Sequence, residues 1–191
     1  CAQSHFAKIN NQFVGTYGDC GTFSFYPGKN LGAYGDAGAI ITNNNILSDK
    51  IRRFANHGSL KKHEHKFEGI NSRLDGIQAS ILLVKLKKIN EWNKKRKKIA
   101  LIYNNLLKNN KLFILPNKQI LNKSVFHLYV IRTKKRNDLI KILKAKKIEY
   151  GIHYPKSLPF LDAYTKFNYT KDDFTNAFML QNEIVSLPIY P

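Results

Sequence analysis

The chain has 191 residues and a formal net charge of +19, and 43% of its residues are hydrophobic and 12% aromatic. This hydrophobic content is typical of a packed globular protein and excludes a disordered chain. No run of about 18 uncharged apolar residues predicts a membrane span, and the N-terminus lacks the basic-then-apolar pattern of a signal peptide. We therefore expect a cytoplasmic protein without a membrane partner. Cys1 and Cys20 form no CxxC pair and are expected to be free thiols.

The positive charge comes mainly from lysine. Of the 32 basic residues 26 are lysines, and asparagine and isoleucine are also abundant. An AT-rich coding sequence produces this bias, whereas a nucleic-acid-binding surface gathers Arg and Lys on one face, often with Arg reading the bases. We favour the compositional explanation, and a basic nucleic-acid-binding module stays open as an alternative.

The first third of the chain predicts two short strands and a helix. Residues 21–27 and 37–43 are apolar runs bounded by Gly, Pro or Asn, which is typical of buried strands. Residues 44–58 predict a helix that ends at Gly58. The polar stretch that follows predicts a loop.

A long helical pattern comes next. Ser72 and Asp75, three residues apart, form a pattern like a capping box and predict a helix start. Apolar residues then recur at helical spacing as far as Leu106, which predicts one long or kinked helix. Within it, the charged stretch 87–100 predicts a solvated helix with one apolar stripe, formed by Ile89, Trp92 and Ile99. A helix this long often joins two domains, and we place the boundary between residues 90 and 91.

The second half of the chain alternates strand and helix patterns. Residues 124–133 predict a strand, 136–148 a helix and 148–155 a second strand, which together indicate a βαβ-like unit. Residues 172–185 predict a further helix, and 186–191 an extended end. The whole pattern predicts an α/β protein.

The stretch "FSFYPGKNLGAYGDAG" sets Lys29 between glycine-rich turns directly after an apolar strand. A lysine amine attacks a carbonyl only when neutral, so its pKa must be lowered by burial or by nearby cations. The glycines allow the backbone to approach a flat ligand closely, and the hydroxyl of Ser24 suits a phosphate. The pattern is neither GxGxxG nor a P-loop. From the residues alone, an exposed turn lysine remains the alternative.

Several segments in order along the chain resemble the pyridoxal-phosphate-dependent sugar aminotransferases of the DegT/DnrJ/StrS family. They are "AQSHFA", "FSFYPGKNLGAYGDAGAI", "NHG", "GINSRLDGIQASIL", "FHLYVIR", "IHYP" and "SLPIYP". The resemblance covers essentially the whole chain. It implies an aspartate aminotransferase-like α/β fold, with part of the large mixed-sheet cofactor domain over residues 1–90. Residues 91–191 would form a small α+β C-terminal domain, incomplete at its end.

The resemblance also implies a cofactor site for pyridoxal 5'-phosphate. In the family, the lysine of this motif, here Lys29, forms a covalent imine with the cofactor. The serine five residues earlier, here Ser24, contacts the cofactor phosphate, and Gln3 lies against the pyridine ring and its 3-hydroxyl. Asn71 reaches the phosphate of the neighbouring subunit, so that two active sites are shared across a homodimer.

The histidines suggest two further candidate site residues, His5 and His153. By resemblance His5 lies near the cofactor, and a hydrogen-bonded structural histidine is the alternative. His153 is a candidate on the substrate side, with a satisfied strand-end histidine as the alternative. His63 and His65 flank Glu64 in a polar loop without a third ligand, so no metal is expected.

The activity that the resemblance implies is transfer of an amino group from glutamate to a nucleotide-linked keto sugar. The segment "GINSRLD" resembles relatives that aminate the third sugar carbon. Some relatives carry histidine in place of the lysine and dehydrate sugars, so Lys29 favours amino transfer.

Full members of the family run to nearly twice this length, so we expect the chain to be the C-terminal portion of such an enzyme. The family's aspartate partner of the pyridine nitrogen would fall one position before Cys1, and its stacking aromatic further upstream. We therefore expect the isolated chain to be inactive. A non-catalytic homologue that retains only a dimerisation or ligand-binding surface is the alternative.

Overall fold

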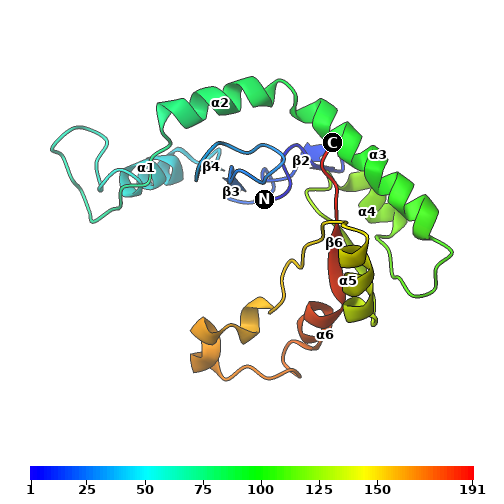
Figure 1. Cartoon of the computed structure of the whole chain (residues 1–191). Coiled ribbons are helices and arrows are strands. Elements are labelled where there is room, and N and C mark those ends of the chain that lie inside the picture. The colour runs from blue at the N-terminus through cyan, green and yellow to red at the C-terminus, as the bar shows by residue number, and fades with distance from the viewer. The chain divides into compact units, whose positions relative to one another are not determined.

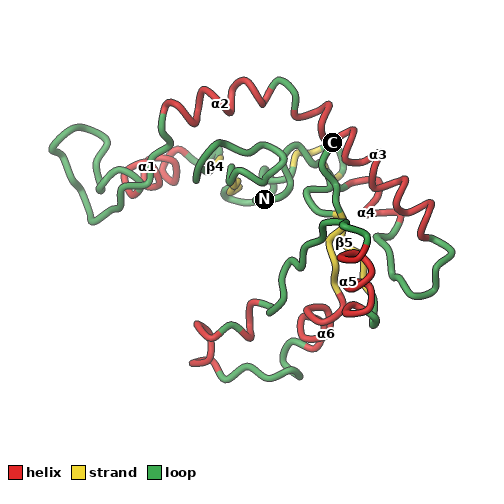
Figure 2. Tube along the Cα trace, viewed as in Figure 1, coloured by secondary structure: helices red, strands yellow, loops and turns green.

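The computed structural model describes residues 1–191 as a mixed α/β chain, which agrees with the predicted α/β class (Figures 1 and 2). The elements are β1 (Lys8–Ile9), β2 (Gln12–Phe13), β3 (Gly21–Ser24), β4 (Gly38–Ile41), α1 (Asn45–Phe54), α2 (Gly76–Leu86), α3 (Ile89–Leu107), α4 (Lys118–Lys123), β5 (Tyr129–Arg132), α5 (Arg136–Ala145), the 3-10 helices η1 (Leu158–Phe160) and η2 (Asp162–Phe167), α6 (Thr175–Glu183) and β6 (Ile184–Leu187).

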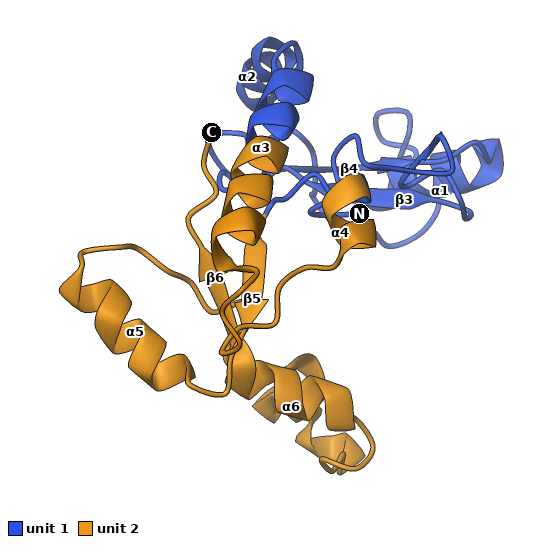
Figure 3. Ribbon diagram, turned by 90° about the vertical axis from the view of Figure 1, so that its right-hand side faces the viewer, with its two compact units in different colours: residues 1–95, 123–127 blue, residues 96–122, 128–191 orange.

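The chain divides into two compact units (Figure 3). Unit 1 holds residues 1–95 and 123–127, and unit 2 holds residues 96–122 and 128–191. Helix α3 begins in unit 1 and ends in unit 2, because the division falls between Lys95 and Arg96.

The antiparallel hairpin of β3 and β4 carries the Lys29 turn in its connection. Phe23 pairs with Ala39 and Ser24 with Gly38 in this ladder. Residues just after Lys29 then join the core of unit 1, formed by Leu31, Ala33, Leu82 and Ile89. Burial of these apolar side chains against α2 and α3 fixes the base of the turn.

Helix α1 is capped by Asn44, whose side chain accepts a hydrogen bond from the Leu47 N–H at 3.0 Å. The helix ends at Phe54, before the predicted stop at Gly58. Gly58 has φ +79°, a left-handed conformation that strains other residues. Its N–H donates to the Arg53 carbonyl in the last turn of α1 at 2.7 Å, so Gly58 closes the chain reversal that follows the helix.

Two predictions about the following helix were wrong in detail. The helix start predicted at Ser72 lies instead at Gly76, because Ser72 N–H already donates to the Ala55 carbonyl at 2.9 Å and holds this segment extended. Asp75 is the N-cap residue but makes no side-chain cap bond. The predicted long or kinked helix consists of two helices, α2 and α3, separated by Lys87 and Lys88.

In unit 2, β5 pairs with β6 in an antiparallel ladder, with Tyr129 opposite Leu187 and Ile131 opposite Val185. The predicted second strand at 148–155, and with it the βαβ-like unit, was wrong. Only an isolated bridge joins Gly151 to Ser186 there.

The helix predicted over residues 172–185 is shorter than expected. Helix α6 ends at Glu183, and the two β-branched residues that follow it form the start of β6. Glu183 also pairs with Arg132 of β5, with 2.9 Å between the Oε2 and Nη2 atoms. This ion pair and the buried Val185 hold the junction of α6 and β6 on β5.

Candidate functional site

In the Lys29 turn, a buried residue directly follows a lysine whose amine makes no ion pair or hydrogen bond. The Lys29 N–H donates to the Tyr26 carbonyl at 2.8 Å, and the next residue, Asn30, is only 4% exposed. The Lys29 side chain is half-buried and takes part in no ion pair or side-chain hydrogen bond of the structure. A lysine held in this way has its backbone fixed while its amine stays available for covalent chemistry.

Helix α2 supplies two polar side chains that hold the far end of the turn. The Lys85 ammonium donates to the Gly32 carbonyl at 2.5 Å and lies 4.8 Å from the centre of the Tyr34 ring. The Gln78 side-chain oxygen accepts a hydrogen bond from the Tyr34 N–H at 2.8 Å. These contacts leave the backbone of the turn little freedom to move away from the helix.

His5 brings the N-terminal segment onto the same strand. Its ring centre lies 5.6 Å from that of Phe23 and 5.8 Å from that of Phe25, and the side chain is 2% exposed. Neither ring nitrogen has a hydrogen-bond partner of good geometry within the chain, although the Ser24 backbone is near enough to act on the ring. Burial lowers the pKa of His5 below its ordinary value of 6.5; the Ser24 backbone opposes this shift and the charge of Lys29 adds to it. His5 is therefore a buried imidazole that is neutral at pH 7.

The lowered pKa of His5 predicts a loss of stability in mild acid. A buried base with a depressed pKa stabilises the fold above its unfolded pKa, and this contribution falls as pH drops from there through the folded pKa. We expect the unfolding free energy, measured in urea, to fall more steeply from about pH 7.5 to about pH 5.5 in the wild-type chain than in His5→Phe. A His63→Gln control in the exposed stretch 60–68 should keep the wild-type slope. Equal slopes for wild type and His5→Phe would contradict this assignment.

Ser24 and Gln3 are the other predicted cofactor contacts in this part of unit 1. Ser24 ends β3, and its oxygen accepts a hydrogen bond from the Tyr26 N–H at 3.3 Å, which leaves the hydroxyl proton free to donate. Gln3 is half-buried two residues before His5, in a turn closed by the hydrogen bond from Ser4 N–H to the Cys1 carbonyl at 3.0 Å. Ser24 and Lys29 thus lie in one hairpin, His5 packs against that hairpin through Phe23 and Phe25, and Gln3 lies on the segment that carries His5.

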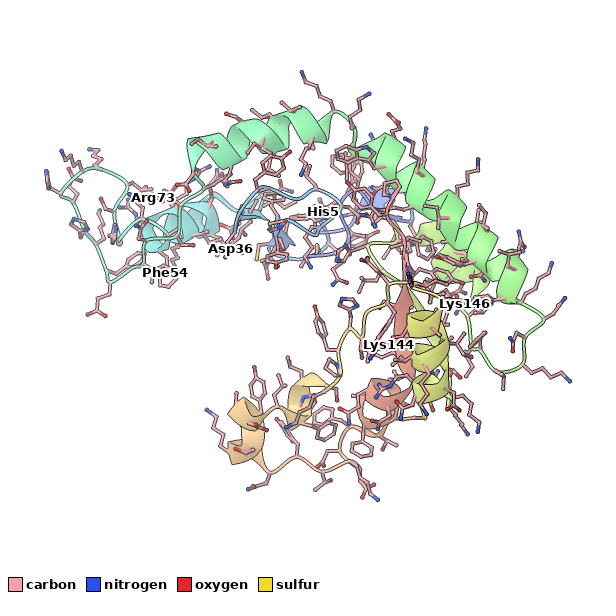
Figure 4. All side chains as sticks on the ribbon, viewed as in Figure 1. His5, Asp36, Phe54, Arg73, Lys144 and Lys146 are labelled. Atoms are coloured by element: carbon pink, nitrogen blue, oxygen red, sulfur yellow. The ribbon has the colours of Figure 1, made fainter.

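Asn71 lies elsewhere in unit 1. It is exposed, and its backbone forms a bridge with Asn56, whose side chain accepts a hydrogen bond from Arg73 at 2.9 Å. Figure 4 shows Arg73 beside α1 and well apart from His5. Within one chain, Asn71 therefore does not join the cluster around Lys29.

His153 belongs to unit 2. Its Nδ1 atom lies 2.8 Å from the Ser186 hydroxyl, so this ring nitrogen has a partner, as the structural alternative requires. The ring also borders a cavity of about 570 Å³ whose other walls are mainly apolar, among them Leu158, Leu161, Leu180 and Ile184.

The structure contains no cluster of side chains suited to a metal ion. No three His, Cys, Asp or Glu side chains come close enough to hold a metal ion. His65 Nδ1 instead lies 2.8 Å from the His57 carbonyl. None of the helices is both long and apolar enough to cross a membrane.

Sequence reasoning missed a buried pair of amides behind the lysine. Asn30 Nδ2 donates to Asn93 Oδ1 at 2.8 Å, and Asn93 Nδ2 donates to the His5 carbonyl at 3.0 Å. Asn93 follows Ile89 by four residues, so helical spacing places both on one face of α3. That spacing was a usable signal, but the surrounding lysines made the stretch look solvated.

The sequence profile of the DegT/DnrJ/EryC1/StrS aminotransferase family matches residues 1–191. The chain belongs to this family. The family membership predicted from the motifs around Lys29 is therefore confirmed.

Similar proteins of this aminotransferase family include a curated relative in Aneurinibacillus thermoaerophilus, "dTDP-3-amino-3,6-dideoxy-alpha-D-galactopyranose transaminase". It is 42% identical over 191 residues, which are 100% of this chain and 52% of the relative. Among solved structures, Streptomyces venezuelae DesV in complex with a ketimine intermediate has a TM-score of 0.94 at 35% identity, over 100% of this chain and 51% of DesV. The chain thus spans about half the length of the relatives it matches. This likeness confirms the predicted fold class.

The cofactor of the family fits the residues present. NtdA from Bacillus subtilis, crystallised with bound pyridoxamine phosphate, has a TM-score of 0.79 at 29% identity and covers 98% of this chain, which covers 45% of NtdA. The family binds pyridoxal phosphate or its pyridoxamine form. In this chain the hairpin that bears Lys29 offers a half-buried amine without an ion pair and a serine hydroxyl proton free to donate, and the buried His5 ring packs on Phe23 and Phe25 of the same stretch. An aldehyde with a phosphate group matches the amine and the hydroxyl.

Proposed function

We propose that this chain forms the lysine-bearing part of a pyridoxal-phosphate-dependent enzyme that transfers an amino group from glutamate to the third carbon of a nucleotide-linked keto sugar. The observation that carries this proposal is the uncommitted amine of Lys29, which stands in the β3–β4 connection directly before the buried Asn30. Family membership and the 3-amino sugar in the name of the Aneurinibacillus relative support the reaction and the position on the sugar.

The proposed roles of the residues follow from their chemistry. When bound, pyridoxal phosphate supplies the electron sink for the reaction. Lys29 Nζ would hold the cofactor covalently and, once released, accept a proton from the reacting carbon and return it. The Ser24 hydroxyl would donate a hydrogen bond to the phosphate, and the Gln3 amide would lie against the ring.

Asn71 would serve the second subunit of a homodimer. Its exposed side chain makes no hydrogen bond within the chain and stands apart from the cluster around Lys29. An amide N–H in this position would donate a charge-assisted hydrogen bond to the cofactor phosphate in the partner subunit. His153 is kept as a proposed substrate-side residue, because it borders a cavity of about 570 Å³.

A hybrid enzyme tests the proposed function. It joins the first half of the Aneurinibacillus relative to this chain, directly before Cys1, and is assayed with glutamate and a dTDP-linked 3-keto sugar. We expect visible cofactor absorbance and formation of the 3-amino sugar, with no product from the first half alone and none from a 4-keto isomer. A folded hybrid that retains the cofactor but aminates neither sugar would contradict the proposed function, and amination of the 4-keto isomer would contradict the proposed position.

A further inference from the structure

Three buried polar groups connect the Lys29 turn to the N-terminal segment through one side chain of α3. Asn30 Nδ2 donates to Asn93 Oδ1 at 2.8 Å and to the Val125 carbonyl at 3.0 Å. Asn93 Nδ2 donates to the His5 carbonyl at 3.0 Å. Asn30 is 4%, Asn93 9% and His5 2% exposed, so water does not substitute for these contacts.

These hydrogen bonds from Asn30 through Asn93 to the His5 carbonyl, called the Asn93 relay below, begin and end beside predicted cofactor-binding residues. Asn30 directly follows Lys29 in the chain, and His5 lies two residues after Gln3. Asn30 Oδ1 has no hydrogen-bond partner, so its amide N–H group alone anchors the side chain. Asn93 therefore hydrogen-bonds both to the residue that follows Lys29 and to the segment that carries Gln3.

We propose that Asn93 is a positioning residue for Lys29: its amide fixes the lysine turn relative to the Gln3–His5 segment, so that the amine and the ring-binding segment meet one cofactor molecule at a set separation. The inference rests on the proposed function of Lys29 and deepens it. Asn93 has no part in the chemistry itself. It acts by preorganising two groups that belong to separate segments of the chain.

A purely structural role for Asn93 predicts something different. Loss of a buried hydrogen bond lowers the stability of any folded chain, wherever that bond is. A positioning role requires in addition that the reactivity of Lys29 changes relative to other lysines. Helix α3 offers a matched control in Asn104, which accepts a hydrogen bond from the Tyr129 hydroxyl at 2.6 Å and donates to the Pro116 carbonyl at 3.2 Å.

The experiment treats the 191-residue chain with pyridoxal phosphate, traps the adducts with borohydride and maps them by peptide mass spectrometry. The readout is the cofactor concentration that half-labels the exposed Lys50 divided by the concentration that half-labels Lys29. It is measured at several pH values, so that a shift in amine pKa is separated from a loss of positioning. In the wild-type chain Lys29 should label at the lower concentration.

In Asn93→Leu this preference should fall by about tenfold, because two buried hydrogen bonds that order the site are lost. In Asn104→Leu it should stay within about twofold of the wild type, although this variant also loses stability in urea. An unchanged preference in Asn93→Leu, or an equal fall in both variants, would overturn the inference.

Asn93→Asp provides a second variant of the same size. Its carboxylate still accepts a hydrogen bond from Asn30 but has no N–H for the His5 carbonyl, so only one end of the relay is kept. We expect a loss of preference for Lys29 of about threefold, between wild type and Asn93→Leu. Wild-type labelling by Asn93→Asp at every pH would show that the contact to His5 is irrelevant and would contradict the proposal.

This inference and the proposed function can fail separately. If Lys29 labelling depends on Asn93 but the hybrid enzyme does not aminate the sugar, the inference is supported and the proposed function is contradicted.

Discussion

A Lys29→Ala variant should lose both the borohydride-trapped pyridoxal phosphate adduct at this position and amination by the hybrid enzyme. The reason is that the half-buried Lys29 amine is uncommitted to any ion pair and stands in the same hairpin as Ser24. Loss of a positioned proton-transfer group commonly lowers a rate by about 10²- to 10⁴-fold, and loss of the covalent anchor adds to this. Turnover should therefore fall below about 0.1% of the wild-type hybrid.

The matched control for this variant is Lys50→Ala. Lys50 is exposed on α1, and its removal changes the net charge by the same amount. The hybrid should keep its absorbance and activity with this change. A trapped cofactor on a lysine other than Lys29, with activity retained in Lys29→Ala, would remove the basis of the proposed function.

Mixed dimers of two variant hybrids test whether Asn71 serves the site of the partner subunit. If Asn71 serves the site of the partner subunit, a dimer of one Lys29→Ala hybrid and one Asn71→Ala hybrid contains one intact site and one site with both defects. Such mixed dimers should regain activity when the two inactive or weakened parents are combined. Activity that stays at the average of the two parents would place Asn71 outside the neighbouring site.

The region around Lys29 was predictable because its signals are local. Gly and Pro bound the apolar run that forms β3, and the hairpin partner β4 follows within the same stretch of sequence. The motif with Ser24 and Lys29 lies inside this hairpin. Short-range turn chemistry and a specific motif therefore placed the strand, the turn and the candidate lysine in one region before the structure was known.

Unit 2 was less predictable because its sheet depends on distant partners. Strand β5 pairs with β6 at the far end of the chain rather than with residues 148–155. A short apolar run such as Ile184 and Val185 suits a buried strand and a buried helix end equally well. Tertiary pairing with Ile131 and Arg132 decided between them, and no local pattern contains that information.

The polar residues behind the lysine turn were missed for a different reason. Asn93 lies on the buried side of α3 with Ile89, among lysines that face the solvent. Composition suggested a solvated stretch, whereas position along the helix indicated burial. A buried amide is tolerated only when its donors and acceptors are paired, so Asn93 required partners that lie far away in the sequence, in Asn30 and His5.

Gly32 should be far more sensitive to substitution than Gly28, although both belong to the Lys29 turn. A Cβ atom added at Gly32 would lie 2.3 Å from the Pro27 carbonyl oxygen and 3.0 Å from that of Tyr26. Both obstacles are backbone atoms, so no side-chain rotation relieves the overlap and the turn itself must open. We expect Gly32→Ala to lower the unfolding free energy by about 3 kcal/mol and to abolish the preferential labelling of Lys29 over Lys50.

Gly28→Ala isolates this steric effect from the general consequences of replacing glycine. Its added Cβ would meet nothing nearer than a Tyr26 ring carbon at 3.9 Å. The unfolding free energy should stay within about 0.5 kcal/mol of the wild type or rise slightly, because alanine restricts the unfolded chain. Labelling of Lys29 should also be unchanged. If Gly32→Ala kept both stability and the preference for Lys29, the backbone contact between Gly32 and Pro27 would not be what sets the position of the lysine, and the turn would have to be held by its contacts to α2 and α3 alone.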